Sequence, residues 1–241
     1  MMQNTCDQFV LSNLNELVDK GFTCFNIDFT DQLKEALKKL NDDLNNQNGH
    51  VEQYRSQRTG RYFNFDSVSS IIYDAVVTEH LVRLLVAYYG EHEPMVFHAV
   101  IIHTPSSANE QPIHRDTSVP ELPVLTLYFD ITNQIVTTEV VPFSHQADID
   151  CVRRRPIRAS HIHNAVIFHA YMAHRGVKAK CDSHKLAISF IAKPKTKVEH
   201  RLCAEHSASF GLNDNDDGLS LVTDRETYRL YAIRHQHLIK K

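Results

Sequence analysis

The chain lacks a long apolar run, because no stretch approaches the roughly eighteen residues needed to span a bilayer. The N-terminal segment MMQNTCDQFVLSNLNELVDKG lacks both the basic and the apolar region of a secretory signal. Cysteine is scarce: the five residues form no CxxC pair and are odd in number, which indicates reduced thiols and argues against a disulfide frame or a zinc finger. These absences predict a cytoplasmic protein with no membrane partner.

An excess of positive charge is also missing. Lysine and arginine number 26 against 29 aspartates and glutamates, which gives a formal net charge of −3. Proteins that bind duplex nucleic acid usually present a basic surface, so a nucleic-acid partner is not expected. The hydrophobic share of 42% and the charged share of 23% are typical of a globular chain that builds a sizeable core.

The first part of the chain has the periodicity of helices. Apolar residues recur at helical spacing in three segments, 8–19, 31–44 and 78–90. Thr30 and Thr78 are suitable N-caps, and Gly21 and Gly90 are suitable helix stops. Between the first two helices the sequence FTCFNID alternates as a short strand.

Near residue 94 the pattern changes to short runs rich in β-branched and aromatic residues. They predict strands at 94–104, 122–132, 137–144, 163–172 and 185–193. A last helix is expected over 223–239. Helices followed by strands predict one mainly β domain, a barrel or jelly roll with flanking helices. We expect a helical layer with the first strands in 1–92, a jelly-roll core with the metal site in 93–195, and a C-terminal loop and helix in 196–241.

The stretch QPIHRDTSVP contains a His-x-Asp pair, His114 and Asp116. In a chain with 16 histidines such a pair is weak evidence by itself. A ferrous site for oxygen chemistry takes two imidazoles and one carboxylate on one face, so a third ligand must come from a distant strand. His174 is the favoured candidate because it follows an apolar run at its exit. His169 is the rival, but it lies inside that run, where a histidine is more often a core residue.

Three segments in order, IHRDT (113–117), VVPFSH (140–145) and VIFHAYMAHRGVKAKCDSHKLAISF (166–190), resemble the motifs of the phytanoyl-CoA dioxygenase family. This family is a branch of the iron(II)- and 2-oxoglutarate-dependent oxygenases, and the resemblance extends over about residues 94–193. It implies a cupin-like double-stranded β-helix in which His114, Asp116 and His174 hold Fe(II). It also implies 2-oxoglutarate and O2 as co-substrates and hydroxylation of a small molecule, with release of succinate and CO2.

The sequence departs from the family pattern at three positions. Phe143 stands where the family has the glycine of PGSH, and Ala179 replaces the usual polar residue five positions after His174. Lys185 stands eleven positions after His174, where most members have arginine. Arginine binds a carboxylate with two parallel hydrogen bonds, whereas lysine offers a compact point charge.

The resemblance nevertheless makes Lys185 the expected partner of the distal carboxylate of 2-oxoglutarate. A solvated lysine at a strand start is the alternative, and His184 and Arg175 are less favoured substitutes. Further co-substrate contacts are expected from residues on neighbouring strands or turns, namely Tyr128, Gln111 and His103.

Two other segments carry weaker signals. The basic run RRRPIR, with Arg153, Arg154, Arg155 and Arg158, is usually a solvated loop, but at the site it would favour a carboxylated, phosphorylated or CoA-linked substrate. The segment NDNDDG (213–218) lacks the closing glutamate of an EF-hand and is interpreted as a turn. Two alternatives to small-molecule hydroxylation remain open: a non-catalytic or degenerate cupin-like barrel, and an oxygenase acting on a protein or nucleic acid.

Overall fold

The structure is a computed structural model that describes most of the chain. Residues outside the description are 1, 47–50, 54–56, 64, 66–67, 118, 133–134, 147–153, 210–229 and 240–241. The segment 213–218 and the first part of the expected helix over 223–239, residues 223–229, therefore lie outside the described residues.

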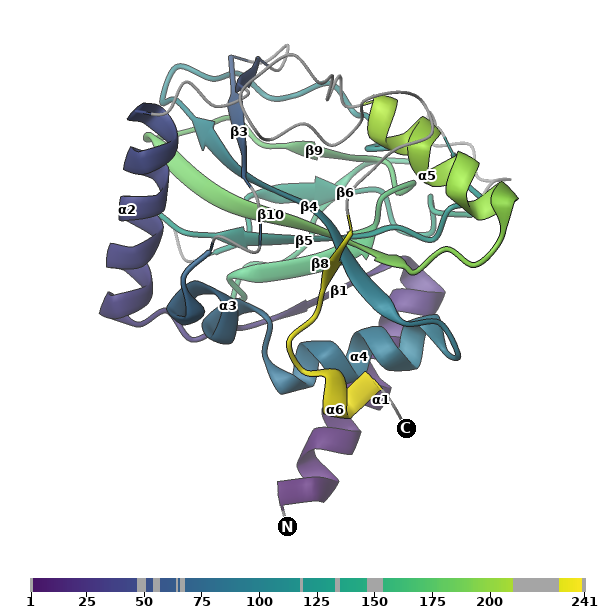
Figure 1. The fold of residues 1–241 in the computed structure, drawn as a ribbon. Helices are drawn as coiled ribbons and strands as arrows, with labels where there is room; N and C mark the ends of the chain where they lie inside the picture. The colour runs from purple at the N-terminus through teal and green to yellow at the C-terminus, as the bar shows by residue number, and fades with distance from the viewer. Residues whose placement is uncertain are drawn as a thin grey trace.

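Two antiparallel sheets form the body of the molecule (Figure 1). The larger sheet has the strand order β1-β8-β5-β10-β4-β3-β2, with β11 paired to β4. Its strands are β1 (Phe22–Phe25), β2 (Val51–Gln53), β3 (Thr59–Phe63), β4 (Pro94–Thr104), β5 (Leu125–Asp130), β8 (Ala165–His169), β10 (Ser183–Ala192) and β11 (Tyr231–Ala232). The smaller sheet has the order β7-β6-β9 and consists of β6 (Thr138–Val140), β7 (Ile157–Arg158) and β9 (His174–Gly176).

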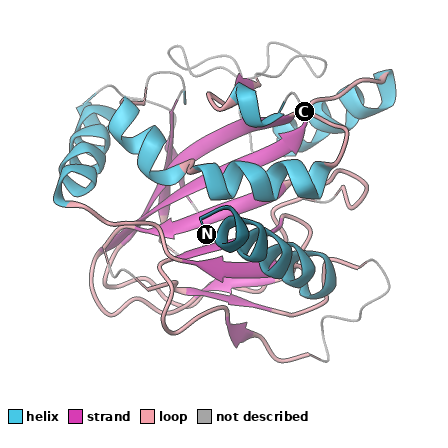
Figure 2. Ribbon diagram, turned by 90° about the horizontal axis from the view of Figure 1, so that it is seen from below, coloured by secondary structure: helices cyan, strands magenta, loops and turns pink. Residues whose placement is uncertain are grey.

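The helices lie outside the sheets. They are α1 (Met2–Lys20), α2 (Asp31–Asn46), α3 (Ser70–Val76), α4 (Glu79–Tyr89), α5 (Lys197–Ser209) and α6 (Gln236–Ile239). Seen from below, helices lie across one face of the strands of the larger sheet (Figure 2). The smaller sheet lies on the other face (Figure 1). The expected mainly β architecture with an N-terminal helical layer is confirmed. Among the described helices, none combines the length and the apolar character needed to cross a membrane.

Alternation along the central strands separates two apolar clusters. On β10, Leu186 and Ile188 face the cluster that packs against the helices, whereas Ala187 faces the cluster between the sheets. On β5, Leu127 and Tyr128 divide in the same way. Because successive side chains of a strand point to opposite faces, Lys185 lies on the same side as Ala187, between the two sheets.

The predicted helix ends are confirmed. The hydroxyl of Thr30 accepts a hydrogen bond from Leu33 N at 3.1 Å, and that of Thr78 accepts one from Leu81 N at 3.4 Å. Gly21 and Gly90 follow their helices with φ of +88° and +63°, a conformation that glycine adopts without a Cβ clash.

The sequence analysis missed several elements. The helices α3 and α5 and the strands β2, β3, β7 and β9 were not predicted. In α5 the buried side chains are small or polar, among them Cys203, Ala204 and His206, so the helix lacks the apolar stripe that the periodicity argument detects. The helix expected over 223–239 was wrong in its described part, where strand β11 precedes the short helix α6.

Phe143, which stands where the resembled motif has glycine, has a left-handed backbone conformation with φ of +67°. A non-glycine residue in this region is strained and costs about 1–2 kcal/mol of stability. Glycine avoids this strain, but it loses more conformational entropy on folding, which offsets part of the gain. We expect Phe143→Gly to raise the free energy of unfolding by about 0.5–1 kcal/mol, measured by urea denaturation. Phe143→Ala is the control, since it retains the strain and loses the contact of the ring with Arg154; equal stability of both variants would contradict the explanation.

Candidate metal centre

His114 and His174 are direct partners across two antiparallel segments. The backbone N of each donates to the carbonyl oxygen of the other at 2.9 Å. Directly opposed residues of an antiparallel pair place their side chains on the same face. The two imidazole rings accordingly lie with centroids 4.5 Å apart.

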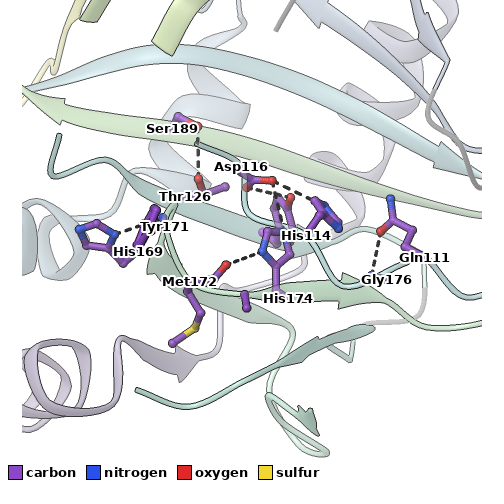
Figure 3. A network of polar contacts seen from close by, with 12 residues as sticks. Gln111, His114, Asp116, Thr126, His169, Tyr171, Met172, His174, Gly176 and Ser189 are labelled. Atoms are coloured by element: carbon purple, nitrogen blue, oxygen red, sulfur yellow. Dashed lines mark hydrogen bonds and ion pairs between the residues drawn. The ribbon is translucent and has the colours of Figure 1, made fainter. Parts of the chain in front are cut away.

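Asp116 reaches the same point from the turn that follows His114. Its backbone N donates to Ala170 O at 3.0 Å, which ties the turn to the end of β8. Its Oδ1 lies 3.3 Å from His174 Nε2 and 3.7 Å from His114 Nε2. One ligand atom from each of the three residues lies within 4.8 Å of the others (Figure 3).

Backbone carbonyls orient both rings. His114 Nδ1 lies 3.0 Å from Pro112 O, and His174 Nδ1 lies 3.0 Å from Met172 O. A carbonyl oxygen only accepts, so in each neutral ring Nδ1 carries the proton and Nε2 presents its lone pair. The two Nε2 lone pairs and the Asp116 carboxylate converge on one point, and the outer hydrogen bonds are those that typically fix metal-binding histidines.

Charge makes the same donor set suitable for a divalent cation. Burial alone would raise the pKa of Asp116, but the neighbouring His174 and His114 hold that pKa below its usual range. Burial lowers the pKa of His114, and the adjacent His174 lowers it further. At neutral pH the cluster therefore offers the Asp116 carboxylate and the neutral imidazole of His114, which are ligand types of a ferrous site.

A cavity of about 230 Å³, here called the metal-side cavity, opens beside His114 and Asp116. Tyr128 lines it, and its hydroxyl donates to Asp116 Oδ2 at 3.4 Å. The ammonium group of Lys185 lies 4.3 Å from the centre of the Tyr128 ring. Lys185 is 7% exposed and has no ion pair or hydrogen bond among the described residues. The Lys185 side chain thus contributes a positive charge to the wall of the metal-side cavity.

The structure separates His169 from the cluster. His169 ends β8, where its Nδ1 accepts a hydrogen bond from Tyr171 N at 3.2 Å (Figure 3). Burial, and then the neighbouring His145, lower its pKa to about 4, so the ring is neutral at pH 7. Its contacts are those of a structural residue.

The other expected contacts divide into two groups. Gln111 lines the metal-side cavity, and its Oε1 accepts a hydrogen bond from Gly176 N at 2.8 Å. His103 does not line this cavity; it stacks on His184 with ring centroids 4.8 Å apart. Arg175 is paired with Glu139 at 2.7 Å and also with Glu110. Neither His184 nor Arg175 is therefore placed as Lys185 is.

Several residues of the cavity wall were not predicted, among them the buried Arg58 and His98. Arg58 precedes β3 and is 2% exposed, with Nη1 donating to Asn109 O at 2.8 Å and Nη2 to Val177 O at 2.6 Å. His98, on β4, stacks against His206 of α5, and burial, followed by the charge of His206, lowers its pKa to about 3. Neither belongs to a motif, so only their place in the fold identifies them.

The described part of the basic run, residues 154–158, does not line the metal-side cavity. Arg153 lies outside the described residues. Arg154 and Arg155 are exposed, and Arg154 Nη1 donates to Pro142 O at 3.3 Å. Arg158 is half-buried, and its Nε donates to Val136 O at 3.1 Å.

No family model matches the chain, and no curated protein matches its sequence. Several solved structures match its fold. The epimerase SnoN, in complex with Fe3+, alpha ketoglutarate and nogalamycin RO, aligns with a TM-score of 0.63 at 12% identity, over 94% of this chain and 96% of its own. The non-heme alpha ketoglutarate dependent carbocyclase SnoK from nogalamycin biosynthesis aligns with a TM-score of 0.61 at 13% identity, over 92% and 96%.

AviO1 from Streptomyces viridochromogenes Tue57 aligns with a TM-score of 0.58 at 15% identity, over 77% of this chain and 97% of its own. Identities this low carry the likeness of the fold and nothing finer. The chain has the jelly-roll fold that is also found in non-heme, alpha ketoglutarate dependent enzymes.

Proposed function

We propose that the protein is an iron(II)- and 2-oxoglutarate-dependent oxygenase that hydroxylates a small molecule. The observation that carries the proposal is the convergence of His114 Nε2, His174 Nε2 and the Asp116 carboxylate beside a cavity that a buried, unpaired lysine also lines. Two imidazoles and one carboxylate are the donor set of non-heme ferrous oxygenases. The fold, shared with alpha ketoglutarate dependent enzymes, supports the same proposal.

In this proposal His114, Asp116 and His174 hold the iron. When bound, iron and 2-oxoglutarate supply, with O2, the oxidising chemistry that ends in succinate and CO2. The residues of the chain position the reactants. Pro112 O and Met172 O keep the two rings in the tautomer that ligates, and the Tyr128 hydroxyl holds the second oxygen of Asp116.

The distal carboxylate of 2-oxoglutarate needs a cation, because an unpaired charge is costly to bury. Lys185 lines the cavity and has its ammonium group available, and Arg58 lines the same cavity. Two of the five N–H groups of the Arg58 guanidinium are used by backbone carbonyls. We therefore assign the carboxylate to a two-cation anchor in which Arg58 compensates for the lysine at position 185.

The metal-side cavity has a volume of about 230 Å³, which suits a small substrate. The substrate and 2-oxoglutarate must together occupy this cavity and the open space next to it. Arg115 lines this cavity beside the cluster, and its positive charge favours a substrate with an anionic group. The solved complex of SnoN contains nogalamycin RO, which also supports a small-molecule substrate. SnoN is an epimerase and SnoK is a carbocyclase. Because hydroxylation adds one oxygen atom whereas ring closure adds none, product analysis is needed to identify the reaction.

The proposal is tested by turnover without the prime substrate. Protein supplied with iron(II), 2-oxoglutarate, ascorbate and O2 is expected to form succinate slowly through uncoupled turnover, measured by mass spectrometry. The Asp116→Ala variant is the control and should form none. Failure of the wild-type protein to bind iron or form succinate would favour the alternative of a non-catalytic barrel.

The proposed anchor predicts a pH dependence of co-substrate binding. Burial, and then the charge of Arg58, lower the pKa of Lys185 to about 8. Above this pH the lysine of the free protein loses its proton, so the affinity for 2-oxoglutarate should fall by up to about tenfold per pH unit. Calorimetry between about pH 7 and 9 measures the slope. The Lys185→Met variant should show a flat profile over this range; the same slope in both proteins would exclude Lys185 as its origin.

A further inference from the structure

We infer that a second cavity, here called the rear cavity, which shares Arg58 and Lys185 with the metal-side cavity but is not lined by the metal cluster, binds a small oxoanion such as a phosphate group. This rear cavity has a volume of about 190 Å³. Its wall includes the start of the β9–β10 connection, residues 177–181, together with Thr137 and Arg158. None of His114, Asp116 and His174 lines it, whereas Arg58 and Lys185 line both cavities.

The charge of the rear cavity is the main observation. Five of its lining residues are cationic, namely Arg58, Arg158, Lys178, Lys180 and Lys185, and none is acidic. Within the described part of the chain, none of these five forms an ion pair. Clustered like charges repel one another and attract counter-ions into a cavity with low-dielectric walls.

Burial distinguishes this cluster from ordinary surface lysines. Lys178 and Lys180 are exposed, but Arg58 is 2% and Lys185 is 7% exposed. A buried cation is usually paired, because its desolvation is otherwise uncompensated. Part of the compensation comes from Asp130, which interacts electrostatically with Lys185 without lining the rear cavity. Its Oδ2 already accepts a hydrogen bond from Thr137 at 2.9 Å.

Unused donors complete the site. The guanidinium of Arg58 keeps three of its five N–H groups after its bonds to Asn109 O and Val177 O. The guanidinium of Arg158 is held through Nε by Val136 O, which leaves its two terminal nitrogens without a partner among the described residues. Planar guanidinium groups with several available donors match the geometry of phosphate and carboxylate oxygens. The small volume restricts the occupant to one such group, free or at the end of a small molecule.

The shared cations couple the rear cavity to the metal-side cavity. An oxoanion beside Arg58 and Lys185 neutralises part of the charge that the proposed function assigns to the 2-oxoglutarate tail. Each ligand should therefore weaken binding of the other by the same factor. This coupling rests on the proposed function, whereas the oxoanion site itself does not.

Calorimetric titration of the metal-free protein with inorganic phosphate tests the site without interference from a bound metal. The Lys178→Gln/Lys180→Gln double variant should bind phosphate about tenfold more weakly than wild type. The Arg154→Gln/Arg155→Gln double variant is the matched control, because it removes two exposed positive charges that line neither cavity and should bind as wild type does. Absence of phosphate binding to wild type, or equal loss in both variants, overturns the inference. Tighter binding of glycerol 3-phosphate than of phosphate would identify the occupant as an organic phosphate.

A second titration, of nickel(II)-loaded protein with 2-oxoglutarate, tests the coupling. Saturating phosphate should raise the apparent Kd for 2-oxoglutarate by about three- to tenfold. If both ligands bind without affecting each other, coupling through Arg58 and Lys185 is overturned. If phosphate binding depends on Lys178 and Lys180 but 2-oxoglutarate does not bind at all, the rear site stands and the proposed function fails.

Discussion

Replacement of His174 by alanine is expected to abolish iron(II) binding and turnover, whereas replacement of His169 should leave both in place. His174 Nε2 is one of the three converging donors, and among the described residues His114 supplies the only other imidazole of this cluster. Loss of a residue that merely orients a metal ligand usually costs about 10- to 100-fold in affinity, so loss of the ligand should exceed about 100-fold. Anaerobic titration with iron(II), followed by calorimetry, measures the change.

His169→Ala is the matched control because it removes a second nearly buried histidine from the same segment. It loses the hydrogen bond from Tyr171 N and should lower the free energy of unfolding by about 1–3 kcal/mol, with iron affinity preserved. His114→Ala removes another ligand of the cluster and serves as a check in case the His174 variant misfolds. The His114 side chain is 38% exposed, so its truncation leaves little cavity. Iron binding that survives in His174→Ala but disappears in His169→Ala would show that the distal ligand is wrongly assigned.

Lys185→Ala should retain iron(II) but lose affinity for 2-oxoglutarate by about one to three orders of magnitude, corresponding to about 1.5–4 kcal/mol for a partly desolvated, charge-assisted pair. Lys185→Met should lose similar affinity while filling more of the space. Arg58→Gln should also weaken binding, because both cations line the cavity. Calorimetry with 2-oxoglutarate, compared with 2-oxovalerate, separates the contribution of the tail, because 2-oxovalerate lacks the distal carboxylate and should bind all variants alike.

Replacement of Lys185 should raise the stability of the folded protein while it weakens the binding of 2-oxoglutarate. The folded-state pKa of Lys185 is about 8, below its ordinary value of 10.5, so folding disfavours the charged lysine. This penalty is fully present below about pH 8 and disappears as the pH rises toward about 10.5. At pH 7 the Lys185→Met protein without ligands should therefore be more stable by up to about 3 kcal/mol, measured by urea denaturation. Unchanged 2-oxoglutarate affinity together with unchanged stability would contradict both the anchor and the burial of an unpaired charge.

Much of the central sheet could be predicted from local patterns. The run at 94–104 is mostly apolar and rich in β-branched residues, and it coincides with β4. The alternation in KLAISFIAK places Lys185 and Ala187 on one face and Leu186 and Ile188 on the other, and the structure has them so. These features depend only on the backbone geometry of a strand and on the side chains that it carries. The helix α5 shows the limit, because its buried face consists of small and polar residues.

The sequence by itself determined that His114 and Asp116 lie close together, since they are two residues apart, and it provided two candidates for a third donor. The tertiary structure, rather than the sequence, brings His174 and not His169 into the cluster, through the register that pairs His114 with His174. Arg58 lines the same cavity as Lys185 for a similar reason. Arg58 precedes β3, which pairs with β4, and β4 pairs with β10, the strand that carries Lys185. Local sequence fixes which face a side chain occupies, but the positions of distant segments relative to one another follow from sheet pairing and packing, which no short stretch encodes.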